Sequence, residues 1–323
     1  MTRRKPFSMG ERDPRADIVD DDPFRNIPRS ASGIHRVHGR KEADGTIYFD
    51  TGTVRQSPQI FQQFFGGVQW NKAQHHTGKI WHFSEEEKRH LTQASLAFTL
   101  ALGFMWVGGI RTISDMGMTS WIVALLLAMP VMFVAVGPAF LLHEIGHKII
   151  AKKNGCWAEF RADPSGLKFG IFLSFFLGFL FMAPGAVMVA GLVTRRQNGH
   201  IAVAGPLVNF GLFLIGIPLW TLLLGLSNAY ETIPSENSAY LEGGTLVWQA
   251  MLIDAAQFWL TANLILGLFN MLPFGPLDGL KVKDWNESAY FIVLSMFLIP
   301  LLLWWFIGLW SPAKLLETLA TMM

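Results

Sequence analysis

The chain has 323 residues, of which 51% are hydrophobic and 15% are charged, and this composition is typical of a membrane protein. Its formal net charge is +2, so it lacks the excess of Lys and Arg that nucleic-acid binding requires, and we exclude nucleic acid as a partner. A single cysteine, Cys156, excludes an internal disulfide framework and a zinc site built from several cysteines.

The polar N-terminal part is expected to contain two segments. Residues 1–33 are rich in Arg, Asp, Pro and Ser, a composition that predicts a disordered tail. Residues 34–90 include a strand-like run at 46–49 and are expected to form a cytosolic N-terminal region. Because no apolar core lies behind the N-terminus, we expect no cleavable signal peptide.

This region ends in a predicted helix start and is unusually rich in histidine. Ser84 and Glu87 have the S-x-x-E spacing of a capping box, which predicts that a helix begins there. Six of the nine histidines precede residue 91, and His90 is the last of them. No helix or turn spacing among them supports a metal cage, so we interpret them as scattered surface residues in preference to a second metal site.

Apolar runs then follow one another, and residues 91–310 are expected to form a transmembrane core. The runs lie at about 92–110, 121–142, 167–193, 201–226, 247–272 and 289–310. Each main run has about the 20 residues that a helix needs to cross the hydrocarbon core. The predicted fold is therefore an all-α polytopic membrane protein with five to six transmembrane helices, followed by a C-terminal tail at 311–323.

The distribution of Lys and Arg predicts the orientation in a cell membrane. Cations gather between residues 148 and 196 and again at 281–283, whereas the loop 227–245 carries glutamates and no cation. This pattern is consistent only if residues 166–200 begin and end in the cytosol. We therefore expect the run broken at Pro184-Gly185 to re-enter as a β-like element between five full crossings, with a cytoplasmic N-terminus. Two short crossings would give the same orientation.

The second apolar run ends in the pattern H-E-x-x-H, formed by His143, Glu144 and His147. On a helix, residues four apart share a face with Cβ atoms about 5–6 Å apart, so both imidazoles can reach one metal ion. Zinc suits two imidazoles, one oxygen ligand and a water, and Glu144 can take a proton from that water. The pattern also occurs by chance on solvated helices, but titratable groups at membrane depth usually mark function.

A second unusual stretch, NMLPFGPLDG at 270–279, follows the fifth apolar run. Its two prolines and two glycines are expected to unwind the end of the span and to leave Asp278 near the same cytosolic depth as the histidines. A carboxylate oxygen can complete a zinc site that already has two imidazoles. The alternative is a helix-terminal Asp in an ordinary turn.

These motifs resemble those of the site-2 protease family of intramembrane zinc metallopeptidases. The resemblance rests on H-E-x-x-H at 143–147, on AGPLVN at 204–209 and on the run 270–279, and it covers about residues 92–285. No PDZ-like insert is evident, and residues 1–90 match no segment of the family.

The resemblance implies a site and an activity. The site is one zinc ion per chain, held by His143, His147 and Asp278, with Glu144 as the general base. Asn270 matches the family's Asn before the Asp, which implies a hydrogen-bond donor to the substrate carbonyl or oxyanion. Capping of the broken helix is the equally weighted alternative for Asn270. The implied activity is regulated intramembrane proteolysis, in which a peptide bond within or near a transmembrane segment of a membrane protein is hydrolysed.

Two other functions stay open at this point. A membrane protease of the prenyl-protein-processing type takes a downstream glutamate as its third ligand, but Glu159 is expected in a polar turn and the glutamates of loop 227–245 on the far side. A metal transporter or a non-catalytic metal-binding protein would place polar residues across several spans, whereas here they gather at one depth. Within the spans, we interpret Asn209 and Asn263 as interhelical hydrogen-bonding residues.

Overall fold

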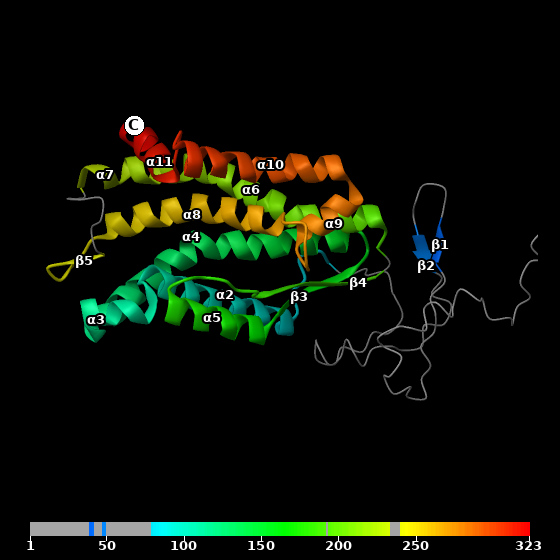
Figure 1. Cartoon of the computed structure of the whole chain (residues 1–323), viewed down its shortest axis with the longest axis horizontal. Coiled ribbons are helices and arrows are strands. Elements are labelled where there is room, and N and C mark those ends of the chain that lie inside the picture. Colours follow the sequence, from blue (N-terminus) through cyan, green and yellow to red (C-terminus); the bar gives the residue numbers. More distant parts are fainter. Residues whose placement is uncertain (1–38, 42–46, 50–78, 192, 233–239) are drawn as a thin grey trace, which may run out of the picture. The chain divides into compact units, whose positions relative to one another are not determined.

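The computed structural model describes residues 39–41, 47–49, 79–191, 193–232 and 240–323 (Figure 1). The chain divides into two units, Met1–Lys72 and Ala73–Met323. In the first unit, β1 (Gly39–Lys41) and β2 (Ile47–Phe49) pair antiparallel, so the short strand expected there is confirmed. The disordered tail predicted for residues 1–33 lies outside the described residues.

The second unit is mostly helical. Its elements in chain order are α2 (Glu85–Trp106), η3 (Gly109–Thr112), α3 (Ile113–Met116), α4 (Met118–Lys153), β3 (Trp157–Ala162), α5 (Pro164–Leu177), β4 (Gly185–Ala190), α6 (Arg195–Leu226), α7 (Ala229–Thr232), β5 (Leu241–Glu242), β6 (Thr245–Leu246), α8 (Trp248–Asn270), α9 (Asp278–Trp285), α10 (Glu287–Leu302), η4 (Leu303–Ile307) and α11 (Pro312–Thr321).

Four of these helices are long and apolar enough to cross a membrane, namely α4, α6, α8 and α10 together with η4. A fifth crossing is formed if α2 and the short helices after it count as one span, which is bent by 46°. The bend falls at Gly108, whose φ of +77° is a left-handed conformation that glycine adopts without strain. The prediction of a polytopic helical membrane protein is therefore confirmed in outline, although small two-stranded sheets accompany the helices.

The interior of the bundle lies between α4, α6 and α8, which run side by side (Figure 1). Met132, Leu260 and Leu264 are fully buried there, each on a different turn or helix of this group. Many large apolar side chains instead face outward, and Leu226 and Phe306 are among the most exposed. An outward apolar surface of this extent is unfavourable in water and is what a lipid-facing helix presents.

The run 167–193 that was expected to re-enter contains most of α5 and all of β4, and it follows β3. The two strands pair antiparallel, with Trp157 opposite Ala190 and Ala162 opposite Gly185, so the tract leaves and returns at one end of the bundle. Between the strands, α5 lies along α2, and Arg111 donates to the Leu177 carbonyl at its far end (Figure 1). The 14 residues of α5 are fewer than the roughly 20 that a crossing helix needs.

The start of α2 follows the sequence prediction only in part. The Ser84 side chain accepts a hydrogen bond from the Glu87 N–H, so Ser84 is the N-cap as expected. The reciprocal half of the predicted capping box is wrong, because the Glu87 carboxylate turns away from the cap. It is buried and instead accepts from Lys148 of α4 and from the Phe160 N–H of β3. Tertiary partners therefore outweigh the local cap here.

Candidate metal centre

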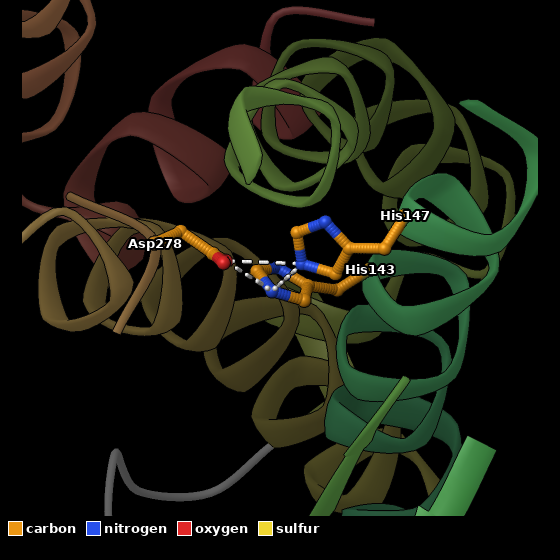
Figure 2. Close-up of side chains that lie close together, drawn as sticks. All are labelled: His143, His147 and Asp278. Atoms are coloured by element: carbon orange, nitrogen blue, oxygen red, sulfur yellow. Dashed lines mark hydrogen bonds and ion pairs between the residues drawn. The ribbon is translucent and has the colours of Figure 1, made fainter. Parts of the chain in front are cut away.

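The two histidines of the H-E-x-x-H pattern lie in the last third of α4. His143 and His147 project from one face of the helix, as residues four apart do, and are 4% and 7% exposed (Figure 2). The helix continues to Lys153 and then ends in a turn at Gly155, which has a left-handed φ of +76°. The pattern is therefore held on a rigid and buried element.

Asp278 reaches the same place through a break between α8 and α9. The chain leaves α8 after Asn270 and turns at Gly275, whose φ of +62° is left-handed, before α9 begins with Asp278 itself. A Cβ added to Gly279 would collide with the Met271 carbonyl oxygen, so the backbone folds tightly against the end of α8. Asp278 is consequently 6% exposed and faces the bundle interior.

The three side chains converge (Figure 2). The Nε2 atoms of His143 and His147 are 3.0 Å apart, and Oδ2 of Asp278 lies 3.4 Å from the first and 3.0 Å from the second. A tetrahedral zinc ion with bonds of about 2.0–2.1 Å places its ligand atoms about 3.3–3.4 Å apart. Among the residues that the structure describes, these three therefore form a cluster that could hold a metal ion, with separations close to those around a tetrahedral zinc ion.

Partners on the other ring nitrogens determine the tautomers. The Nδ1 atom of His143 lies 2.6 Å from the side-chain oxygen of Asn209, and Nδ1 of His147 lies 2.7 Å from the Ile201 carbonyl oxygen. Both oxygens can only accept, so each Nδ1 carries the proton and each Nε2 presents a lone pair. Two lone pairs and a carboxylate that face one another repel unless a cation lies between them, which fits a metal site.

Asn209 itself is held in one orientation. It is fully buried in α6, and its amide nitrogen donates to the Ala139 carbonyl and to the side-chain oxygen of Asn263. The expected interhelical hydrogen bond between spans is therefore confirmed. The sequence analysis missed that Asn209 also reaches His143, although the AGPLVN run was the available signal.

Gly205, in the same run of α6, supplies the space for the cluster. A Cβ added at Gly205 would overlap the Nε2 atom of His147 and lie 2.5 Å from the Nε2 atom of His143. Any larger residue would therefore occupy the position where the two imidazoles meet. The backbone of α6 approaches the cluster this closely only because the residue has no side chain.

Glu144 lies beside the histidines and points toward β4. Its Oε2 accepts from the Val187 N–H at 3.1 Å. This contact joins the carboxylate next to the cluster to the edge of β4 that faces away from β3. The strand belongs to the β-like element that was expected near Pro184-Gly185.

The remaining predicted site residue, Asn270, lies at the end of α8. Its amide nitrogen donates to the Leu266 carbonyl one turn back in the same helix, at 3.0 Å, so neither helix capping nor substrate binding is decided for Asn270. Near it, Lys281 donates to Oδ1 of Asp278.

Glu159, which was weighed as a third ligand, and a second carboxylate, Asp254, have other partners. Glu159 lies in β3, not in a turn as expected, and its carboxylate bonds Ser84 and Arg161. Asp254, near the opposite end of α8, accepts a hydrogen bond from Tyr240. Neither belongs to the cluster of His143, His147 and Asp278, which is the group that could hold a metal ion.

A buried His-His-Asp cluster beside a glutamate, inside a bundle of apolar helices, defines an integral membrane metalloenzyme. The family model described as Peptidase family M50 matches residues 131–284. "Putative zinc metalloprotease MJ0611" of Methanocaldococcus jannaschii is 37% identical over 161 residues, which are 50% of this chain and 72% of that protein. "Putative zinc metalloprotease YwhC" of Bacillus subtilis is 30% identical over 197 residues, which are 54% of this chain and 82% of that protein.

A more distant match is "Zinc metalloprotease MJ0392" of Methanocaldococcus jannaschii, which is 27% identical over 152 residues, 47% of this chain and 33% of that protein. No solved structure matches the chain. The chain belongs to Peptidase family M50, the site-2 protease family, and it is a zinc metalloprotease. The resemblance that its motifs indicated is thereby confirmed.

Proposed function

We propose that this protein hydrolyses a peptide bond within or near a transmembrane segment of another membrane protein, as in regulated intramembrane proteolysis. The observation that carries the proposal is the convergence of His143, His147 and Asp278 next to Glu144, at one end of a helical bundle. The three side chains would hold one zinc ion per chain. When bound, zinc would polarise the scissile carbonyl and lower the pKa of its water to about 7.

The residues of the chain have separate tasks in this proposal. Glu144 takes a proton from the attacking water and later delivers it to the leaving nitrogen. Asn209 and the Ile201 carbonyl keep the two imidazoles in the tautomer that leaves each Nε2 free for the metal. Asn270 donates to the substrate carbonyl or oxyanion. To do so, its amide nitrogen releases the Leu266 carbonyl to which it is now bonded.

A transmembrane substrate must be unwound locally, because a helical backbone hides its carbonyl in its own hydrogen bonds. The outward edge of β4 offers a template for such an unwound segment. Val187, on this edge, already contacts Glu144, so a segment paired there lies next to the proposed base. The strand thus supports both unwinding and placement of the substrate.

The proposed location is a cell membrane, with the metal centre near the cytosolic face and the N-terminus in the cytosol. The cations of segments 148–196 and 281–283 support this orientation, because cytosolic loops carry the excess of Lys and Arg. Water then reaches the metal from the cytosolic side. The orientation is tested with cysteines introduced at Gln197 and at Glu242 and a membrane-impermeant thiol reagent added outside the cell. We expect the cysteine at Gln197 not to react.

The function is tested by mapping cut sites in co-expressed membrane proteins by mass spectrometry, for the wild type and for Glu144→Gln. We expect cuts within or beside apolar segments that are absent with Glu144→Gln. Zinc flux into vesicles without cleavage would support the transporter alternative. Cleavage confined to prenylated C-termini would support the prenyl-protein-processing alternative, and equal cleavage by both forms would end the assignment.

A further inference from the structure

The outer edge of β3 is occupied by side chains of α2. The N–H of Phe160 donates to Oε1 of Glu87 at 3.0 Å, and the N–H of Ala162 donates to Nδ1 of His90 at 2.9 Å. The two acceptors are three residues apart on the helix, and the two donors are two residues apart on the strand. Consecutive outward N–H groups of β3 are therefore both bonded by α2, much as a neighbouring strand would bond them.

β3 and β4 form a two-stranded ribbon, which has one free edge on each strand. The edge that belongs to β4 is directed at the candidate metal centre. Val187 faces Phe160 and Gly185 faces Ala162 in the antiparallel register. In an antiparallel pair whose residues do not bond each other, both residues direct their N–H and C=O groups away from the partner strand. The two residues thus expose these groups at opposite edges of the ribbon. The Val187 N–H accordingly donates to Glu144, and this edge is the one beside the cluster.

Glu87 also ties β3 to the helix that carries the metal ligands. Its second oxygen accepts from Lys148, which follows His147 directly, and both side chains of the pair are almost completely buried. The Lys148 ammonium additionally lies 3.5 Å from the centre of the Phe83 ring. Lys148 is four residues after Glu144 on α4, so one face of this helix bonds β4 directly through Glu144 and is linked to β3 through Lys148 and Glu87.

We propose that Glu87 and His90 are positioning residues, which close the outer edge of β3 so that an unwound substrate segment pairs only with β4, beside Glu144. The proposal rests on the proposed function. An exposed strand edge is a template for pairing with any extended chain. A segment added to β3 would lie about 14 Å from one added to β4, that is three strand spacings, and would be out of reach of the base.

His90 allows the sharper test, because its two nitrogens have separate partners. Since Nδ1 accepts from Ala162, Nε2 carries the proton and faces Glu86, whose carboxylate lies 3.1 Å away. His90→Leu removes the acceptor. His90→Asn is the conservative variant, since its Oδ1 takes the place of Nδ1, and Glu86→Ala is the matched control that removes only the exposed partner.

The full-length chain in detergent is assayed with a fluorescent single-span peptide that carries a Gly-Pro interruption in its apolar segment. We expect His90→Leu to lower kcat and KM together, each by about tenfold, with the cut bond unchanged, because peptide paired with β3 occupies the enzyme out of reach of the base. His90→Asn and Glu86→Ala should cut the wild-type bond at close to the wild-type rate. Wild-type kcat and KM in His90→Leu would overturn the proposal.

A cross-linking arm covers the case in which His90→Leu does not fold. Arg161 and Ala186 face each other across the ribbon, and the single native thiol is removed by Cys156→Ala. With a cysteine in the peptide, we expect a disulfide to Ala186→Cys and none to Arg161→Cys. Equal linking to both strands would overturn the proposal.

This arm is run in Glu144→Gln, so it reports pairing without hydrolysis and separates the two claims. If the wild type cleaves no more than Glu144→Gln, the proposed function fails, whatever the cross-links show. If the wild type cleaves but the peptide links to β3, only the role of Glu87 and His90 fails.

Discussion

Phe160 and Val187 face each other across the β3–β4 ribbon, and each gives its outward N–H to a glutamate, Glu87 on one side and Glu144 on the other. Glu87 is paired with Lys148, which lies one turn after Glu144 on α4. This residue pair is thus bonded at both edges of the ribbon to α4, the helix with the H-E-x-x-H pattern. Glu144 belongs to α4, and Glu87 is bonded to Lys148 of α4.

Glu144→Gln should abolish proteolysis while zinc stays bound. The amide keeps an oxygen that accepts from the Val187 N–H, but it has no basic oxygen for the proton of the attacking water. General base catalysis contributes about 10²–10⁴-fold, and a loss of this size is expected. Cleavage of the single-span peptide and zinc content by mass spectrometry measure the two quantities. A variant that lost its zinc would show that Glu144 is needed for the fold of the site instead.

Asp278→Ala should weaken zinc binding by more than about 100-fold. This loss is larger than the one expected when a residue that only hydrogen-bonds a metal ligand is removed. The reason is that two imidazoles are left without the anionic oxygen that lies 3.0–3.4 Å from them. The control is Asp284→Ala, on the exposed side of the same helix, which should bind one zinc per chain as the wild type does. Competition with a zinc chelator gives both affinities, and equal values would remove Asp278 from the ligand set.

Asn209→Ala should lower zinc affinity by about 10–100-fold without removing any ligand. The change leaves Nδ1 of His143 without its acceptor, so the ring loses both its orientation and its fixed tautomer. Asn263→Ala, which removes only a partner of Asn209, should have a smaller effect. Zinc titration of the purified proteins tests the order of the two variants, and the reverse order would contradict the proposed role of Asn209.

Gly205→Ala should prevent zinc binding, although it adds only a methyl group. That methyl would lie on the Nε2 atoms of His143 and His147, so the helices must separate or the imidazoles must turn away. Gly211→Ala, two turns further along α6, meets no atom within 4 Å and is the matched control. Zinc content per chain separates the two variants. Wild-type zinc in Gly205→Ala would mean that α6 approaches the site less closely.

Lys148→Met should destabilise the protein by about 3–5 kcal/mol, because it leaves the Glu87 carboxylate buried and unpaired. Lys153→Met, on the exposed side of the same helix end, should change stability by less than about 0.5 kcal/mol. Denaturant unfolding in detergent, followed by tryptophan fluorescence, compares the two. If both variants unfold at the same denaturant concentration, the buried pair does not stabilise the link between α2 and α4.

Local patterns in the sequence were sufficient for much of the site and for the outline of the fold. Residues four apart share a helix face whatever the rest of the chain does, so His143 and His147 could be paired from their spacing alone. Long apolar runs predict spans because only a lipid-facing or buried helix can carry them. The prolines and glycines before Asp278 likewise predicted the break that brings its carboxylate inward, although Asn270 appeared equally suited to capping and to substrate binding.

Tertiary structure decided what depends on distant partners. Ser84 and Glu87 look like an ordinary capping box in the sequence, and His90 looks like one surface histidine among several, because the residues that bond them are about 60–75 positions away. Asn209 was assigned to a helix contact for the same reason. The sequence predicted which groups meet in the candidate metal centre. Only the packing of α2, α4 and α6 around the ribbon determined how those groups are oriented and which strand edge faces them, since hydrogen bonds between distant segments leave no periodic signal.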